Sequence, residues 1–252
     1  MHAEVSGSGP DLVLLHGWGM TAQVWNGLAA LLESRFRVHR IDLPGYCRSR
    51  AMAPCTHDAI VEALVAGCAA RATVCGWSLG GQLAIRWARR NPEQVGRLIL
   101  IASTPRFVCG PGWESGMEPQ LLDEFMQALE HDPQETLRRF ALLQGDGDTG
   151  GRAVSRRLRE CLAVNGAADV ATLTAGLQLL RDADLRAELP GIAQPVLLLQ
   201  GEHDTVVPPG AAAYMRRTMP RATLATIAGA AHAPFIANAP EIARHITEFC
   251  HG

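Results

Sequence analysis

Ser78 stands in a short pattern whose residue types and spacing are typical of a reactive serine. The pattern is Gly-Trp-Ser-Leu-Gly at residues 76–80, between an apolar run that predicts a strand and a helical pattern over 79–90. A serine at such a strand–turn–helix corner is held in a strained backbone conformation, and the flanking glycines let strand and helix pass close together. The helix N-terminus beside the hydroxyl favours developing negative charge. The sequence therefore predicts a nucleophilic serine at position 78.

Two later residues supply the base and the carboxylate that such a serine needs. A serine hydroxyl is a weak nucleophile until a neighbouring base removes its proton, and a third group must orient that base. Asp204 follows one late apolar run and His232 follows the next, so both come just past the carboxyl end of a predicted strand. We predict His232 as the base and Asp204 as the orienting acid. Glu202 is the alternative acid, which we disfavour because it lies closer to the strand end, and neighbouring His203 is interpreted as a surface residue.

An early glycine-rich loop completes the predicted site. It reads His16-Gly17-Trp18-Gly19 and follows the first clear apolar run. Attack on a carbonyl produces an oxyanion, which two backbone N–H groups stabilise, one after the nucleophile and one from an early loop of this kind. We predict that Leu79 and Trp18 donate these N–H groups. A chemical role for His16 is the alternative, but a histidine beside a glycine turn more often braces the loop.

The elements that must position these residues alternate along the chain. Short apolar runs bounded by turn residues predict buried strands at 12–15, 38–41, 73–75, 98–101, 196–199 and 224–227. Helical patterns between most of them cover 24–34, 57–70, 79–90, 209–219 and 240–251. Strands that alternate with helices form a mainly parallel, doubly wound α/β sheet.

The alternation stops between the fourth and fifth predicted strands, where the pattern becomes all-helical. Helices are predicted at 118–131, 133–144, 151–164 and 169–181, with the glycine-rich segment 145–151 joining two of them. Such an insertion is expected to cap the carboxyl edge of the sheet, where ligands bind in these folds. The predicted organisation is a core of 1–106 and 190–252 with a helical cap (lid) at 107–189.

Composition sets limits on the partners and the compartment. With 252 residues and 48% hydrophobic residues, the chain fits one α/β domain with a sizeable core. A net charge of −2 gives no global attraction to nucleic acid or to an anionic membrane. The cysteines are scattered without a metal-binding pair, and no apolar stretch is long enough for a membrane span. The simplest interpretation is a cytoplasmic enzyme that uses no metal and no organic cofactor.

Several motifs occur together in a family-specific order. They are H-G-W-G, D-L-P-G-Y, G-W-S-L-G-G, the helical insertion, G-E-H-D and A-A-H-A-P-F. In this order the chain resembles the α/β-hydrolase superfamily over nearly its whole length. The first motif followed by Val24-Trp25, the serine pattern and the Ala-His-Ala-Pro-Phe-Ile ending resemble more closely the pimeloyl-acyl-carrier protein methyl ester esterases of biotin synthesis.

The resemblance assigns the catalytic roles to the same residues as the chemical argument above. It implies Ser78 as nucleophile, Asp204 as acid and His232 as base, with oxyanion donors at Trp18 and Leu79. The chain departs from the family in having Cys47 where glycine is common, and in a short segment before Leu12 that leaves the first edge strands open. The implied partner is acyl carrier protein carrying a pimeloyl methyl ester.

A group of arginines in the insertion is the candidate carrier surface. Three of them recur at helical spacing, which places their guanidinium groups on one helix face. The group consists of Arg138, Arg139, Arg152, Arg156, Arg157 and Arg159. In the resembled family such arginines dock the acidic carrier, and Arg139, Arg152 and Arg156 match those positions, with Phe140 beside the acyl entrance. The alternative is an ordinary solvated helix face.

The sequence therefore predicts a serine carboxylesterase that releases methanol from pimeloyl-acyl-carrier protein methyl ester. Its pocket is expected to be apolar and lined by Trp18, Trp77 and aromatic residues of the cap such as Phe140. Small esters are expected as further substrates, and the chain is expected to be a monomer. A general short-chain carboxylesterase, a carbon–carbon bond hydrolase of the same fold and a non-catalytic ligand receptor stay open as alternatives.

Overall fold

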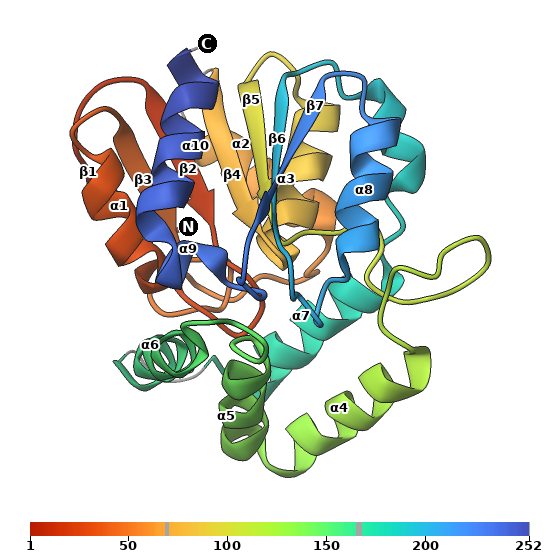
Figure 1. Ribbon diagram of the computed structural model, residues 1–252. Helices are drawn as coiled ribbons and strands as arrows, with labels where there is room; N and C mark the ends of the chain where they lie inside the picture. The colour runs from red at the N-terminus through yellow and green to blue at the C-terminus, as the bar shows by residue number, and fades with distance from the viewer. Residues whose placement is uncertain (69–70, 165–167, 252) are drawn as a thin grey trace.

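A twisted, mostly parallel sheet forms the centre of the molecule (Figure 1). The computed structural model describes residues 1–68, 71–164 and 168–251. Within them the sheet has seven strands in the order β1-β3-β2-β4-β5-β6-β7. The strands are β1 (Ala3–Ser6), β2 (Asp11–Leu15), β3 (Arg37–Ile41), β4 (Ala72–Trp77), β5 (Val95–Ile101), β6 (Val196–Gly201) and β7 (Ala222–Ile227). Only β1 pairs antiparallel, with β3, and the other neighbours in this sheet are parallel.

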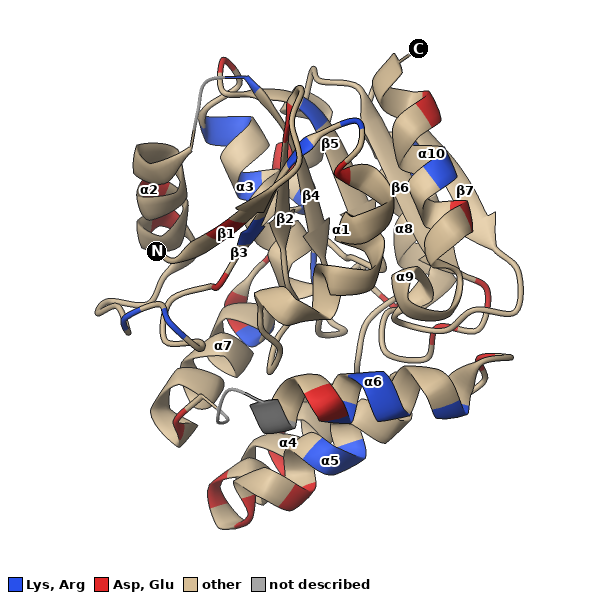
Figure 2. Ribbon diagram, turned by 90° about the vertical axis from the view of Figure 1, so that its left-hand side faces the viewer, with Lys and Arg blue, Asp and Glu red and all other residues tan. Residues whose placement is uncertain are grey.

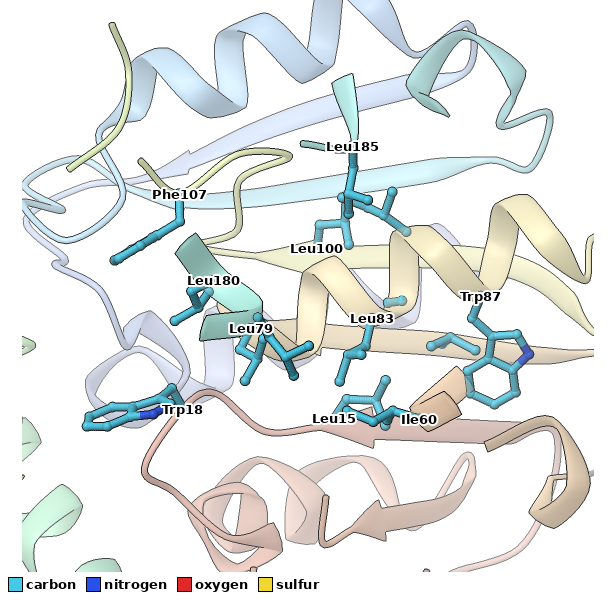
Figure 3. Packing of buried hydrophobic residues seen from close by; sticks show 14 of the residues in the cluster. Leu15, Trp18, Ile60, Leu79, Leu83, Trp87, Leu100, Phe107, Leu180 and Leu185 are labelled. Carbon is cyan, nitrogen blue, oxygen red and sulfur yellow. The ribbon is translucent and has the colours of Figure 1, made fainter. Parts of the chain in front are cut away.

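Strand alternation divides the core between the two faces of the sheet. On β2, Val13 and Leu15 point into one buried cluster, whereas Leu12 and Leu14 point into the other, as the period of two in a strand requires. The first cluster lies under α2 (His57–Gly67), α3 (Leu79–Arg90) and α8 (Pro209–Thr218). The second lies under η1 (Ala22–Trp25), α1 (Asn26–Leu32), α9 (Pro234–Ala237) and α10 (Ala239–His251). Figure 3 shows Leu83 of α3 directed toward Leu15 and Ile60 in the first cluster.

The predicted α/β fold is confirmed, and the six predicted strands correspond to β2–β7. The sequence did not settle the edge, where β1 pairs with β3 so that Ala3 faces Ile41. The predicted helix 24–34 begins as the 3-10 helix η1 and ends at Leu32. The predicted helix 57–70 ends at Gly67, and its last positions, Ala69 and Ala70, lie outside the described residues.

Among the described residues, four longer helices lie between β5 and β6 in the chain, at the carboxyl end of the strands (Figure 1). They are α4 (Pro119–His131), α5 (Pro133–Leu143), α6 (Gly151–Val164) and α7 (Val170–Asp182), and the 3-10 helix η2 (Arg186–Gly191) follows them. Side-chain caps mark two starts: Asp132 accepts the N–H of Glu135, and Asp169 accepts that of Thr172. The predicted cap range includes residues 165–167, and the predicted core range includes Gly252, which the structure does not describe. None of the described helices combines the length and hydrophobicity needed to cross a membrane.

The two ends of this helical insertion meet. The N–H of Leu185 donates to the carbonyl of Pro105 over 2.8 Å. Arg106 Nη1 lies 2.9 Å from Asp184 Oδ2. Because β5 and β6 are also neighbours in the sheet, the chain leaves and re-enters the core at one place.

The close crossing of α3 over β2 depends on Gly80. A Cβ built at this position would lie 2.3 Å from the carbonyl oxygen of Leu15 and 2.7 Å from that of His16. These are backbone atoms of a central strand and its following loop, so they cannot move aside as a flexible side chain would. The strand–turn–helix corner therefore requires glycine here.

Replacing Gly80 with alanine should destabilise the fold. We expect the free energy of unfolding to fall by about 1–3 kcal/mol, because the added methyl group must push α3 away from β2. Urea denaturation monitored by circular dichroism measures this. Gly27→Ala is the matched control: this glycine is exposed on α1 and a Cβ there has no neighbour within 4 Å, so alanine should raise stability slightly. Equal effects of the two changes would contradict the steric argument.

Candidate active site

Ser78 occupies the corner between β4 and α3 in a strained conformation. Its φ of 53° and ψ of −116° lie in a region that non-glycine residues rarely adopt. The strain is held in place by the N–H of Ser78, which donates to the carbonyl of Ile101 over 3.1 Å. A Cβ at Gly17 would lie 3.3 Å from Ser78 Cβ, so the early glycine loop passes directly over the serine. The backbone strain predicted for this corner is present.

Asp204 and His232 form a buried hydrogen-bonded pair. His232 Nδ1 lies 2.9 Å from Asp204 Oδ2 and 3.1 Å from Oδ1, and the residues are 1% and 3% exposed. The backbone N–H groups of Val206 and Val207 both donate to Asp204 Oδ1 over 2.9 Å. With its carboxylate fixed in this way, Asp204 holds the imidazole in one orientation and leaves Nε2 available as the acceptor of a proton.

The serine is connected to this pair through its neighbour. Trp77 Nε1 donates to the carbonyl oxygen of His232 over 2.8 Å, and the two rings lie 5.6 Å apart. Among the described residues, His232 Nε2 has no hydrogen-bond partner, and no hydrogen bond joins Ser78 Oγ to it. Such bonds are often long before substrate binds. The structure thus joins acid and base directly and places the serine next to a side chain that contacts the base.

The early loop presents backbone donors beside Ser78. The part of the chain that the structure describes contains no acceptor for the N–H of Trp18 or of Leu79. The loop is held from two sides: the Trp18 indole Nε1 donates to the carbonyl of Leu173 in α7 over 2.8 Å, and the N–H of Gly19 donates to the Tyr46 hydroxyl over 3.4 Å. Within the described residues these two N–H groups have no acceptor, which is compatible with the predicted oxyanion site.

His16 braces the loop, as expected. Its Nε2 accepts the N–H of Leu43 over 3.0 Å, and Nδ1 lies 2.8 Å from the carbonyl oxygen of Gly17. Since Nε2 accepts, the ring is neutral and Nδ1 donates. Complete burial lowers the pKa of His16 to about 4, which suits this structural hydrogen-bonding role.

The alternative acid Glu202 and its neighbour His203 make their hydrogen bonds away from the His232–Asp204 pair. Glu202 is exposed and its Oε2 accepts the N–H of Gly229 over 2.9 Å. His203 is also exposed, and its Nδ1 lies 2.9 Å from the carbonyl oxygen of Gly147. Of the two candidate acids, Asp204 is therefore the one that contacts His232.

Known proteins resemble this chain in sequence and in fold. Residues 10–239 match the family described as alpha/beta hydrolase fold. The chain belongs to the α/β-hydrolase family. This hydrolase is 45% identical, over 94% of its own length and 94% of the relative's, to a protein of Nitrosomonas europaea named pimeloyl-acyl-carrier protein methyl ester esterase. A protein of Aromatoleum aromaticum with the same name is 41% identical, with 96% and 99% covered.

Solved structures confirm the α/β-hydrolase fold. An esterase from Exiguobacterium antarcticum superposes with a TM-score of 0.88 at 22% identity, covering 100% of this chain and 95% of that one. An enol-lactonase from Burkholderia xenovorans gives 0.87 at 22% identity, with 100% and 96% covered. The resemblance predicted from the motifs is confirmed at both levels, the family and the group of esterases.

Aromatic side chains gather around Trp18 of this α/β hydrolase. The Trp18 ring lies 5.4 Å from that of Phe125 and 5.2 Å from that of Phe140, both edge to face. Figure 3 shows Trp18 and Phe107 near the start of α3, with Leu79 and Leu180 between them. Trp77 instead packs in the opposite core, 5.0 Å from the Phe235 ring and beneath Gly17. It supports the site from below, and its contact with substrate stays a prediction.

Three of the arginines of α6 line one groove of about 1040 Å³, whereas Arg157 of the same helix donates to the carbonyl of Gln23. Arg152, Arg156 and Arg159 line it together with Leu142 and several loop glycines, so the predicted common helix face exists. Figure 2 shows the blue segments of α5 and α6 next to each other. Arg139 lies on α5, where its side chain is 73% exposed.

Sequence reasoning missed the acids that flank these arginines. Glu135 lies 2.7 Å from Arg139, and Glu160 lies 3.8 Å from Arg156. The i,i+4 spacing of both pairs was the available signal. These contacts neutralise part of the charge and are salt-sensitive because the side chains are exposed.

Gln200 is a second residue that sequence reasoning missed. Its Nε2 donates to Asp204 Oδ2 over 3.0 Å and to the carbonyl of Val207 over 3.1 Å. The side chain is buried at the end of β6. A single polar side chain in an otherwise apolar strand was the signal, since a buried amide needs partners.

The pH dependence of stability should carry the signature of His16. In the unfolded chain this histidine gains its proton near pH 6.5, but in the folded protein only near pH 4. Between these values the unfolded state binds more protons, so the free energy of unfolding should decrease as the pH falls from 6.5 to 4. Urea unfolding of wild type and His16→Gln across pH 4–8 measures it. The variant should be less stable at pH 7 and show a shallower decline, and parallel curves would contradict the assignment.

Proposed function

We propose that this chain is a serine carboxylesterase that hydrolyses the methyl ester of pimeloyl-acyl-carrier protein to the free acid and methanol. The observation that carries the chemistry is the buried His232–Asp204 pair, in which His232 Nε2 has no hydrogen-bond partner among the described residues, together with the strained backbone of Ser78. The substrate comes from the name shared by relatives that align over nearly the whole chain.

The proposed reaction passes through an acyl-enzyme. Ser78 Oγ attacks the ester carbonyl while His232 Nε2 takes its proton and then returns it to the leaving methanol. Asp204 keeps Nδ1–H in place and stabilises the imidazolium. Water, activated by the same imidazole, then releases the acid and restores the serine.

The N–H groups of Trp18 and Leu79 are proposed to stabilise the oxyanion of both steps. Each such donor contributes about 2.7–4 kcal/mol to transition-state stabilisation in serine hydrolases. Because the Trp18 side chain is hydrogen-bonded to α7, its backbone donor is fixed relative to the helical insertion. We propose that residues 107–189 act as the cap of a core formed by 1–106 and 190–252, with Trp18, Trp77 and Phe140 contacting the acyl chain.

The groove on α6 is proposed to receive the carrier. Acyl carrier proteins are acidic, and their phosphopantetheine adds a phosphate, so guanidinium groups can steer and hold them. Arg152 and Arg156 lie on one wall of the groove, and Arg139 lies on neighbouring α5. Leu142 adds an exposed apolar contact at the same place. Small free esters, which need no docking, are proposed as slower substrates of a monomeric enzyme.

Ser78→Ala should abolish ester hydrolysis without unfolding the protein. We expect kcat for dimethyl pimelate to fall by at least about 10⁴-fold, since the remaining groups supply no nucleophile. Methanol release measures the activity, and circular dichroism checks the fold. Retained turnover would contradict the mechanism.

Turnover of a vinylogous diketone in preference to esters would favour the carbon–carbon bond hydrolase alternative.

Charge reversal in the groove should separate carrier recognition from chemistry. In the double variant Arg152→Glu and Arg156→Glu, kcat/KM for the carrier-bound ester should fall by about tenfold or more, because two attractive contacts become repulsive. Activity on dimethyl pimelate should stay within about twofold. The wild-type preference for the carrier-bound ester should weaken with added salt.

Arg216→Glu with Arg217→Glu is the matched control for this variant. Both residues are exposed on α8, outside the groove, and the change in net charge is identical. We expect no loss with either substrate. Equal losses in the two double variants would mean that net charge, rather than a docking groove, governs the rate.

A further inference from the structure

The segment between α5 and α6 contacts both loops that carry the acid and the base. The N–H of Ala231 donates to Asp148 Oδ2 over 3.0 Å. The N–H of Thr149 donates to the carbonyl of Gly229 over 2.9 Å. On the side of the acid, His203 bonds to the carbonyl of Gly147. In Figure 1 this green segment lies directly below the blue loops that follow β6 and β7.

Asp148 is the centre of these contacts. The carboxylate is half-buried, and each oxygen accepts one backbone N–H: Oδ1 that of Gly150 over 2.6 Å, and Oδ2 that of Ala231. The first bond closes a turn within its own loop. The second crosses to the residue that directly precedes His232. Bonds from N–H groups to a carboxylate are stronger than those between neutral groups.

The base loop is also held by the end of β6 and the loop that follows it. The N–H of His203 donates to the carbonyl of Ala230 over 2.9 Å. A Cβ at Gly201 would lie 2.0 Å from the carbonyl oxygen of Ala231, so the backbone of this loop rests against the end of β6. Contacts with residues 201 and 203 thus hold the backbone at 230–231, and the side chain of Asp148 adds a further hydrogen bond to it.

We propose that Asp148 is a positioning residue for the base: by holding the N–H of Ala231, it sets the place of His232 relative to Ser78. This proposal rests on the proposed function, in which His232 Nε2 takes the serine proton. Nδ1 is fixed by Asp204, but the distance of Nε2 from the serine depends on where the backbone of residue 232 sits. Displacements well below 1 Å matter for a proton-transferring group.

Two variants test the brace. Asp148→Asn keeps the size of the side chain but replaces one acceptor with an NH₂ group, and Asp148→Ser keeps one oxygen for Gly150 and none for Ala231. In both, we expect kcat for dimethyl pimelate to fall about tenfold, with KM within about twofold of wild type. Asp146→Asn is the matched control, because Asp146 is exposed in the same loop and its side chain makes no hydrogen bond to the described residues, so kcat should be unchanged.

A spectroscopic readout separates positioning from simple stability. The low-field proton resonance of His232 Nδ1–H reports its bond to Asp204 and is assigned by its loss in His232→Ala. It should shift or broaden in both Asp148 variants and stay in place in Asp146→Asn. Variants that lose thermal stability but keep the wild-type kcat and resonance would overturn the proposal.

The two proposals fail in distinguishable ways. If wild type hydrolyses esters and Ser78→Ala does not, the proposed function stands whatever the Asp148 variants do. If wild type hydrolyses no ester, the function fails, and the resonance of the His232 proton still decides whether Asp148 holds the base loop.

Discussion

The buried hydrogen bond between His232 and Asp204 requires donors for the carboxylate and two loops that meet at one edge of the sheet, and much of the surrounding structure provides them. A carboxylate with almost no exposure needs donors, and the N–H groups of Val206 and Val207 and the amide of Gln200 supply them. The two residues must also meet at one edge of the sheet. The parallel register of β6 and β7, with Gly201 opposite Ile227, brings the following loops together there. Gly201 is needed because any side chain would collide with the base loop.

Much of the fold and the core of the site could be predicted from the sequence because they rest on local signals. Buried strands are continuous apolar runs. Because parallel strands place their carboxyl ends at the same edge of the sheet, the positions of Asp204 and His232 just after two strands predicted that these residues lie close together. The strained corner at Ser78 is encoded within five residues. β1 escaped prediction because Ala3–Ser6 is short and only half-buried, so its sequence resembles that of a polar terminus.

The rest depends on contacts between segments that are distant in the chain. The bond from Ala231 to Asp148 spans 83 positions, and that from Trp18 to Leu173 spans 155. The hydrophobic periodicity of the sequence does not predict such pairs, because the direction of one side chain depends on how whole helices and strands pack together. The arginines of the helical insertion give a further reason. Their common helix face could be predicted, but the net charge of that face depends on Glu135 and Glu160, which lie just outside the segment in which the arginines cluster.

The helical insertion leaves the core after β5 and returns to it before β6 at one closed junction, where Pro105 is bonded to Leu185 and Arg106 to Asp184. Because β5 and β6, which flank the insertion, pair directly with each other, their register does not depend on the length of the insertion or on the arrangement of its helices. Lengthening a closed loop adds little entropic cost, since that cost grows only with the logarithm of its length. The insertion is therefore a module in the evolutionary sense: its surface can change while the serine, histidine and aspartate keep their framework.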